Sequence, residues 1–222
     1  MALGFKPSAL EWELQKIQLP ISFHMHTTKE ESHGISGIRV EMHMGKTHGH
    51  SCADMELSSE PLLLDFATCQ NVLENEDASD TVKNNTIRVF NRLAAAQANV
   101  EKKPIKDLRF PPVVLVNMVG VVIGLEKLGI KKILCSSISN GVQSDSKAPL
   151  ITPLVGEILQ DIQVVPASTS LDLITPTGAA LVAELADSFE PLPNWPNAKT
   201  GYGFGPHKFA DRPQVLCALL NE

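Results

Sequence analysis

The hydrophobic period of this chain changes several times along its length, and this alternation limits the folds that it can adopt. Between residues 21 and 44 apolar and polar residues alternate, which is the period of a strand with one buried face. Between residues 79 and 100 apolar residues recur at helical spacing. Strands interleaved with helices predict an α/β or α+β fold, with a mixed sheet layered against helices in a single compact domain or two small lobes.

The strand-like stretch at residues 21–44 predicts a two-stranded antiparallel unit. Its alternation places His24 and His26 on one face of the first strand. The same alternation places Glu41 and His43 on one face of the second strand. We therefore expect polar strand faces that carry histidines.

Capping residues and prolines predict the other elements. Ser8 and Glu11 have the spacing of a capping box, which predicts a helix at residues 8–18. Ser79 can cap a longer helix that ends near Val100. The same signals predict helices at residues 61–73, 113–127, 154–159 and 179–188, strands at residues 131–138 and 162–165, and a strand or short helix at residues 215–220.

Composition excludes several classes of protein. With 222 residues and 43% hydrophobic content, the chain can bury a core. Its 19 basic and 25 acidic residues give a net charge of -6 without long runs of either sign, so we expect no nucleic-acid partner. The four cysteines form no CxxC pair, which fits a reducing, cytoplasmic location. No secretory signal peptide is evident, and the apolar run at residues 113–125 is shorter than the roughly 20 residues that span a bilayer.

Histidines are concentrated in one part of the chain. Six of the 7 histidines lie between residues 24 and 50. Neutral imidazole binds nickel, zinc and copper, and a His-x-His pair on an extended strand presents both rings on one face. The alternative is that exposed strand faces simply tolerate histidine. The candidate metal ligands are His24, His26, His43, His48, His50 and Asp54.

A second candidate site is LITPTGAAL at residues 173–181. Thr175 and Thr177 supply hydroxyl groups, and Gly178 stands just before the predicted helix, for which Thr177 is the predicted cap. The N–H groups and dipole at such a helix start favour a phosphate or carboxylate. An ordinary capped helix start is the alternative, and the sequence alone favours it.

The glycine-rich motif near the C-terminus and the cysteines give weaker indications of function. GYGFG at residues 201–205 does not match the dinucleotide-binding pattern, and its glycines predict a tight turn. Cys52 stands two positions after His50, but the sequence gives no clear nucleophile and base pair. Cys69 and Cys135 lie in apolar stretches and are predicted to be core thiols.

Several segments occur in the order and at the spacing of one known family. The combination of TPTGAA with the terminal GYGxG and RPxVL pattern is the most specific part. Together the segments resemble the nickel insertion proteins known as LarC over most of the chain. The segments are THGHSCADM at 47–55, the helix-like stretch at 80–100, VGVVIGLEKLGIKKILCSS at 119–137, APLITPLVGEIL at 148–159, LITPTGAAL at 173–181, GYGFG at 201–205 and DRPQVLCALLNE at 211–222.

This resemblance implies a lyase that inserts nickel into a pyridinium bisthiocarboxylate mononucleotide to make the nickel-pincer cofactor. In that family the reaction depends on CTP and a divalent cation such as manganese. The resemblance implies His48, His50 and Asp54 as the first metal ligands. The reaction also needs a base, and Glu41 and Asp54 are the candidates nearest to the histidines in sequence. A homo-oligomer is compatible with the sequence. The residues implied to hold the phosphate or carboxylate end of the mononucleotide are Thr175, Thr177 and Gly178.

The chain also departs from the family pattern. The family has a strand and a DCFSGISGDM-like loop ahead of this chain's first residues, and it continues into a further C-terminal domain. Its HFHEVGAVDSIVDI-like segment is replaced here by IKDLRFPPVVLVNM at 105–118, where Asn117 stands in place of an aspartate. Three functions stay open: nickel insertion with the missing parts supplied by partner chains, a non-catalytic metal-binding relative or scaffold, and a binder of a phosphorylated small molecule at Thr177.

Overall fold

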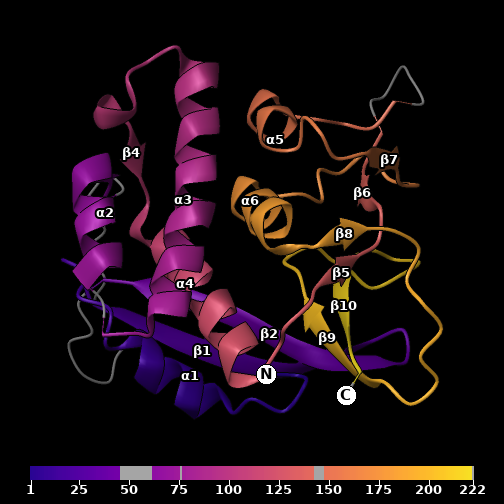
Figure 1. The fold of residues 1–222 in the computed structure, drawn as a ribbon. Helices are drawn as coiled ribbons and strands as arrows, with labels where there is room; N and C mark the ends of the chain where they lie inside the picture. The colour runs from indigo at the N-terminus through magenta and orange to yellow at the C-terminus, as the bar shows by residue number, and fades with distance from the viewer. Residues whose placement is uncertain (46–61, 76, 143–147, 222) are drawn as a thin grey trace, which may run out of the picture. The chain divides into compact units, whose positions relative to one another are not determined.

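A computed structural model describes residues 1–45, 62–75, 77–142 and 148–221 of the chain. The chain divides into two compact units (Figure 1). One, here called the sheet unit, comprises Met1–Glu60 and Asn194–Glu222, and the other, here called the helical unit, comprises Pro61–Pro193. The predicted α/β class is confirmed, in the form of two units rather than one domain.

The sheet unit is built on a four-stranded sheet in the order β1-β2-β9-β10. The predicted antiparallel unit is confirmed as its first pair, and β2 continues the sheet by pairing in parallel with β9. His33 and Gly34 form the turn between β1 and β2, and both have positive φ, as a type I′ hairpin turn requires. The elements are α1 (Pro7–Leu14), β1 (Phe23–Ser32), β2 (Ile35–Met44), β9 (Lys199–Phe204) and β10 (Val215–Leu220).

The GYGFG motif does not form the predicted tight turn. Its first four residues lie in β9, which pairs antiparallel with β10. Glycine serves here to let backbones approach closely, because a Cβ at Gly201 would lie 2.9 Å from the Cβ of Ala2. The prediction was wrong because local sequence does not separate a glycine needed for a turn from one needed for close packing.

We expect Gly37→Ala to lower the free energy of unfolding by about 1–3 kcal/mol, the usual cost of overpacking. A Cβ on Gly37 would lie 2.5 Å from the carbonyl oxygen of Tyr202 and 2.9 Å from the ring of Phe204, so β2 and β9 would have to separate. Urea unfolding of the whole chain measures the change. Gly203→Ala is the matched control, because a Cβ there meets nothing within 4 Å. Equal losses in the two variants would contradict this account of the strand pairing.

The helical unit is organised around α3, which packs against α2, α4, α5 and α6 (Figure 1). In the described part of this unit, three two-stranded sheets accompany these helices: β3 with β4, β5 with β8, and β6 with β7. The elements are β3 (Leu64–Asp65), α2 (Phe66–Asn75), α3 (Asp80–Glu101), η1 (Ile105–Asp107), β4 (Arg109–Phe110), α4 (Pro112–Lys127), β5 (Leu134–Cys135), β6 (Ile138–Asn140), α5 (Pro153–Ile158), β7 (Val164–Pro166), α6 (Pro176–Leu185) and β8 (Ser188–Phe189).

Aromatic packing forms the centre of the helical unit. Phe90 of α3 is fully buried, with its ring centroid 5.6 Å from that of Phe66 and 4.9 Å from that of Phe110. The side chain of Ser79 accepts a hydrogen bond from the N–H of Val82 at 3.1 Å, so the predicted cap of α3 is confirmed.

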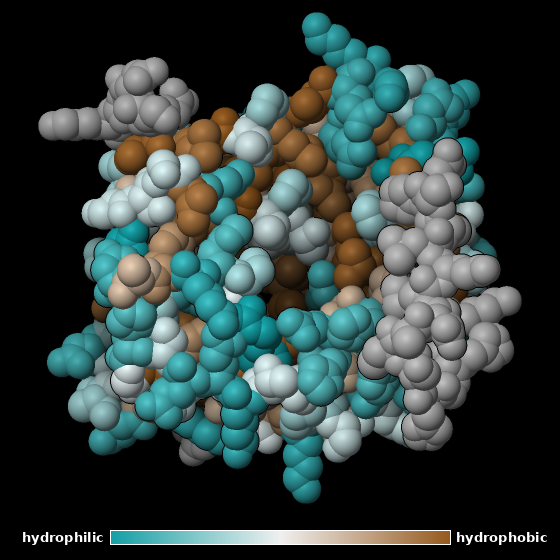
Figure 2. Space-filling view, turned by 180° about the vertical axis from the view of Figure 1, so that it is seen from behind, coloured by the Kyte–Doolittle hydropathy of each residue, from teal (hydrophilic) through white to brown (hydrophobic). Residues whose placement is uncertain are grey.

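On the face seen in Figure 2, hydrophilic residues predominate and hydrophobic residues show through in patches. Within the described ranges, no helix is both long and apolar enough to cross a membrane.

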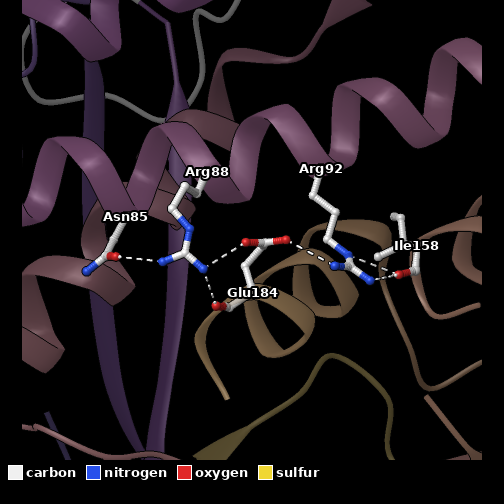
Figure 3. Close-up of polar contacts among 5 residues, drawn as sticks. All are labelled: Asn85, Arg88, Arg92, Ile158 and Glu184. Atoms are coloured by element: carbon white, nitrogen blue, oxygen red, sulfur yellow. Dashed lines mark hydrogen bonds and ion pairs between the residues drawn. The ribbon is translucent and has the colours of Figure 1, made fainter. Parts of the chain in front are cut away.

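Two arginines on α3 fix the C-terminal ends of the short helices (Figure 3). Arg92 donates two hydrogen bonds, at 3.1 and 2.8 Å, to the carbonyl oxygen of Ile158, the last residue of α5. Arg88 donates to the carbonyl oxygen of Glu184 near the end of α6 at 3.2 Å. The carboxylate of Glu184 lies between the two guanidinium groups, at 3.1 Å from Arg88 and 3.0 Å from Arg92. Carbonyls that lack partners within their own helices are thus satisfied by α3.

Candidate functional site

The predicted histidine-bearing strand faces meet on one side of the β1–β2 hairpin. His24 lies directly opposite His43, and His26 lies directly opposite Glu41. All four side chains are exposed. We call these four residues the hairpin face. The predicted placement of the three histidines is confirmed, whereas their role as metal ligands stays a prediction.

The strand register brings the rings of His24 and His43 within reach of one ion. The N–H of Gly45 donates to the carbonyl oxygen of Ser22 at 2.9 Å, two pairs further along the same ladder. Since hydrogen-bonded and non-hydrogen-bonded pairs alternate, His24 and His43 form a hydrogen-bonded pair with Cα atoms about 5.5 Å apart. Metal–imidazole bonds are about 2 Å long, so two rings on neighbouring strands can bind a single ion.

A helix supplies a carboxylate to this face. The Nδ1 atom of His24 lies 2.9 Å from Oε1 of Glu11, and their side chains are 56% and 26% exposed. Helix α1 packs against β1 and buries Leu10 and Leu14, which leaves the intervening Glu11 to reach the strand. Sequence reasoning missed this contact, because it assigned Glu11 to a capping box. No spacing in the sequence signals a contact between a helix and a strand.

The capping box itself is absent. Lys6 is the N-cap residue of α1, with no side-chain hydrogen bond, and Pro7 occupies the first turn. Proline suits this position because the first helical N–H has no partner within the helix. The proline therefore shifts the helix start ahead of Ser8 and frees Glu11 for His24.

Glu30, another carboxylate on the same hairpin, is paired with an arginine. Glu30 accepts a hydrogen bond from Nε of Arg39 at 2.6 Å, and Arg39 also donates to the carbonyl oxygen of Gly205 at 2.6 Å. The hydrogen bond from Arg39 holds the pKa of Glu30 below its usual range. Glu11, which contacts His24, and Glu41, which lies opposite His26 in the strand register, are therefore the carboxylates assigned to this face.

The hairpin face does not by itself complete a multidentate metal site. In the part of the chain that the structure describes, no group of three or more His, Cys, Asp or Glu side chains is arranged to hold an ion. The candidate ligands His48, His50 and Asp54 lie outside the described residues. Among the described residues, the strand register thus supports His24 and His43 as a pair of imidazoles that one ion could bridge.

The second candidate site has a different cap from the one predicted. Thr175, and not Thr177, is the N-cap of α6, and its side chain accepts from the N–H of Gly178 at 3.1 Å. Pro176 begins the helix and has no N–H to offer an anion. The carboxylate of Asp172 accepts from the N–H of Ile174 at 3.2 Å, just ahead of the cap. These contacts are those of an ordinary helix start, and ligand binding by Thr175, Thr177 and Gly178 stays a prediction.

A buried asparagine positions the segment before α6. Asn140 is fully buried, and its Nδ2 donates to the carbonyl oxygen of Leu150 at 2.5 Å and to Oδ1 of Asp172 at 2.9 Å. Its Oδ1 accepts from the N–H of Leu173 at 2.5 Å. Asn140 therefore ties β6 to the chain on both sides of α5 and β7, which sequence reasoning did not detect.

Cys69 and Cys135 offer no activated thiolate. Cys69 is buried as predicted, and burial, together with the charge of Asp65, raises its pKa to about 12. Burial also raises the pKa of Cys135, but this residue is only half-buried, so its prediction as a core thiol was wrong. A raised pKa leaves the thiol protonated and unreactive at neutral pH. Cys52 lies outside the described residues.

The segment that departs from the family pattern contributes to the core. Phe110, Leu115 and Val116 are buried at the start of α4 and just before it, and Phe110 packs edge-on against Phe90. Asn117 is exposed on α4. This stretch of the chain therefore supports the helical unit by packing.

Comparison with known proteins finds one family that matches the whole chain. The model of a family described as nickel insertion protein matches residues 1–222. A relative from Syntrophobacter fumaroxidans, provisionally named a nickel insertion protein, is 30% identical over 228 residues, covering 99% of this chain and 55% of the relative. A protein of Clostridium kluyveri named pyridinium-3,5-bisthiocarboxylic acid mononucleotide nickel insertion protein is 28% identical, covering 99% of this chain and 57% of the relative.

A protein of Staphylococcus epidermidis with that same name is 27% identical, over 99% of this chain and 54% of the relative. The chain thus spans about half the length of the curated relatives that it matches. No solved structure matches the chain.

Proposed function

The chain belongs to the nickel insertion protein family, and from this premise we propose that it acts in the insertion of nickel into pyridinium-3,5-bisthiocarboxylic acid mononucleotide. The observation that carries the proposal is the family match over residues 1–222. Relatives named for this reaction align with 99% of the chain. In this function nickel is the substrate that the protein receives and passes on.

The histidines are the groups that we assign to nickel. On the hairpin face, His24 and His43 lie opposite one another and His26 is the next histidine on the same face of β1. Imidazole is a good ligand for Ni²⁺. His48, His50 and Asp54 complete the proposed set as the residues that match the family's histidine-aspartate segment.

The reaction also requires a base and a place for the mononucleotide. Insertion replaces a ring C–H bond by a nickel–carbon bond, so a proton has to leave the ring. Glu41 is opposite His26 and exposed, which makes it the described candidate for that base, beside Asp54. We assign the phosphate or carboxylate end of the mononucleotide to Thr175, Thr177 and Gly178. CTP and a divalent cation such as manganese are co-reactants by the family resemblance.

One observation favours a second function, that of a non-catalytic nickel-binding relative. At residues 105–118 the chain lacks the family's histidine and glutamate, and the structure shows Phe110 and α4 packed into the core there. A protein of this kind binds nickel, keeps the fold and performs no insertion.

Product formation separates the two functions. The purified chain is incubated with Ni²⁺, the mononucleotide, CTP and Mn²⁺, and the nickel-containing product is measured by mass spectrometry. The Clostridium kluyveri relative serves as the positive control. Nickel insertion predicts product from this chain that falls by more than about 10-fold when His24 and His43 are both alanine, as the loss of metal ligands implies. Nickel binding without product, while the control is active, identifies the non-catalytic relative.

A further inference from the structure

The contact between Glu11 and His24 determines which nitrogen of His24 is free for a metal. A neutral imidazole carries its proton on one ring nitrogen and a lone pair on the other. An ionised carboxylate only accepts hydrogen bonds, so a neutral His24 ring that makes this 2.9 Å contact carries its proton on Nδ1. The lone pair of His24 is therefore on Nε2, on the side of the ring away from Glu11.

We infer that Nε2 of His24 and the imidazole of His43 form an open two-ligand site for a divalent transition-metal ion, and that Glu11 is the residue that positions His24. Assigning the ion as nickel rests on the proposed function. The site itself rests on the register that places His24 opposite His43 and on the Glu11 contact. Glu11 belongs to α1, outside the histidine-rich segment, so neither composition nor motif points to it.

This arrangement matches a known way of tuning metal ligands. A ligating histidine usually donates its second N–H to a carboxylate, which fixes the ring and makes the free nitrogen more basic. Loss of such a partner typically weakens metal affinity by about 10- to 100-fold. Glu11 is only 26% exposed, and α1 holds it against β1, so the ring of His24 is oriented before an ion arrives.

An open site with two protein ligands suits a metal ion that the protein later transfers to a substrate. Structural metal sites are closed by four protein ligands, whereas sites that exchange ligands keep positions for water or substrate. In the described part of the chain no third His, Cys, Asp or Glu joins this pair to make such a closed site. The pair by itself therefore leaves coordination positions open to other ligands of the chain, to water and to the sulfur atoms of an incoming substrate.

Nickel binding by a variant that lacks His48 and His50 tests the proposed site at His24 and His43. His48→Ala and His50→Ala are introduced together, so that the histidine-rich segment does not mask the hairpin, and Ni²⁺ alone is titrated by calorimetry. We expect one ion per chain and a loss of affinity of at least about 10-fold for either His24→Ala or His43→Ala. Because the two rings act as one site, the double variant should be no weaker than each single variant. His207→Ala, which removes an exposed histidine outside the pair, is the matched control.

The role of Glu11 has its own readout. The ¹⁵N spectrum of the His24 ring, recorded without metal, should show the proton on Nδ1 in the parent protein. Glu11→Ala should shift the proton towards Nε2 and weaken Ni²⁺ binding by about 10-fold or more. Glu31→Ala removes the same charge from the hairpin without touching His24, since Glu31 lies opposite Ser36, and should change neither quantity. Unchanged unfolding midpoints confirm that the variants are folded.

The outcomes separate this inference from the proposed function. Nickel affinity that survives His24→Ala and His43→Ala overturns the two-imidazole site, even if the chain makes product. Affinity that falls equally with Glu11→Ala and Glu31→Ala, with the proton of His24 unmoved, overturns the positioning role. If nickel binding follows the expected pattern but no product forms, the proposed insertion activity is wrong and the inferred metal site still holds.

Discussion

Asn140→Asp is expected to lower the free energy of unfolding of the helical unit by about 3–5 kcal/mol, the cost of an uncompensated buried charge. The two side chains have the same shape, so the change removes no packing. Aspartate loses both donors that Asn140 offers to Leu150 and Asp172, and it places a second carboxylate against Asp172. Only the bond from the N–H of Leu173 survives. Denaturation in guanidinium chloride, followed by circular dichroism, measures the loss.

A reversed pair provides the control for this prediction. Asp172→Asn alone should cost less, because its amide oxygen can still accept from Asn140 and from the N–H of Ile174. Combined with Asn140→Asp, it restores a donor between the two side chains and should recover part of the stability. A cost below about 1 kcal/mol for Asn140→Asp would contradict the claim that this residue holds the segment before α6.

Phe90→Ala is expected to cost about 3–5 kcal/mol, the usual range for a fully buried phenylalanine. The ring is 0% exposed and packs against both Phe66 and Phe110, so its removal leaves a cavity between α2, α3 and β4. The same unfolding measurement applies. Phe90→Leu keeps most of the apolar volume and should cost clearly less. Equal costs for the two variants would show that the site collapses and that the aromatic packing contributes little.

Local signals predicted the elements well where the determining contacts lie within one turn. Ser79 caps α3 as expected because the hydroxyl group and the N–H of Val82 are three residues apart. The cap of α6 was misplaced from Thr175 to Thr177. Pro176 sets φ for a first helical residue, and this moves the helix start ahead of the threonine that the apolar pattern suggested.

Sequence periodicity gave the faces of the hairpin but not its register. Alternation placed His24 and His43 on polar faces, and either could have faced a different partner. The two-residue turn at His33 and Gly34 fixes the pairing, because it sets which residues of β1 and β2 lie opposite. Register is a property of both strands together, so the pair of imidazoles appears only in the structure.

The remaining contacts of the candidate site are tertiary. Glu11 reaches His24 from a helix that precedes the strand, and Asn140 reaches Asp172 across a long stretch of chain. The sequence contains these residues without any spacing that connects them. By contrast, the family resemblance depends on the order of several motifs, and the match over residues 1–222 confirms it.

Transfer of bound nickel in a single turnover tests the central claim most directly. The chain is loaded with Ni²⁺, freed of unbound metal, and mixed with pyridinium-3,5-bisthiocarboxylic acid mononucleotide, CTP and Mn²⁺, and the nickel-containing product is counted against the nickel first bound. The account predicts that the bound nickel moves into the product, in an amount that falls with His24→Ala and His43→Ala. Nickel that stays on the protein, under conditions in which the Clostridium kluyveri relative transfers it, would contradict the account.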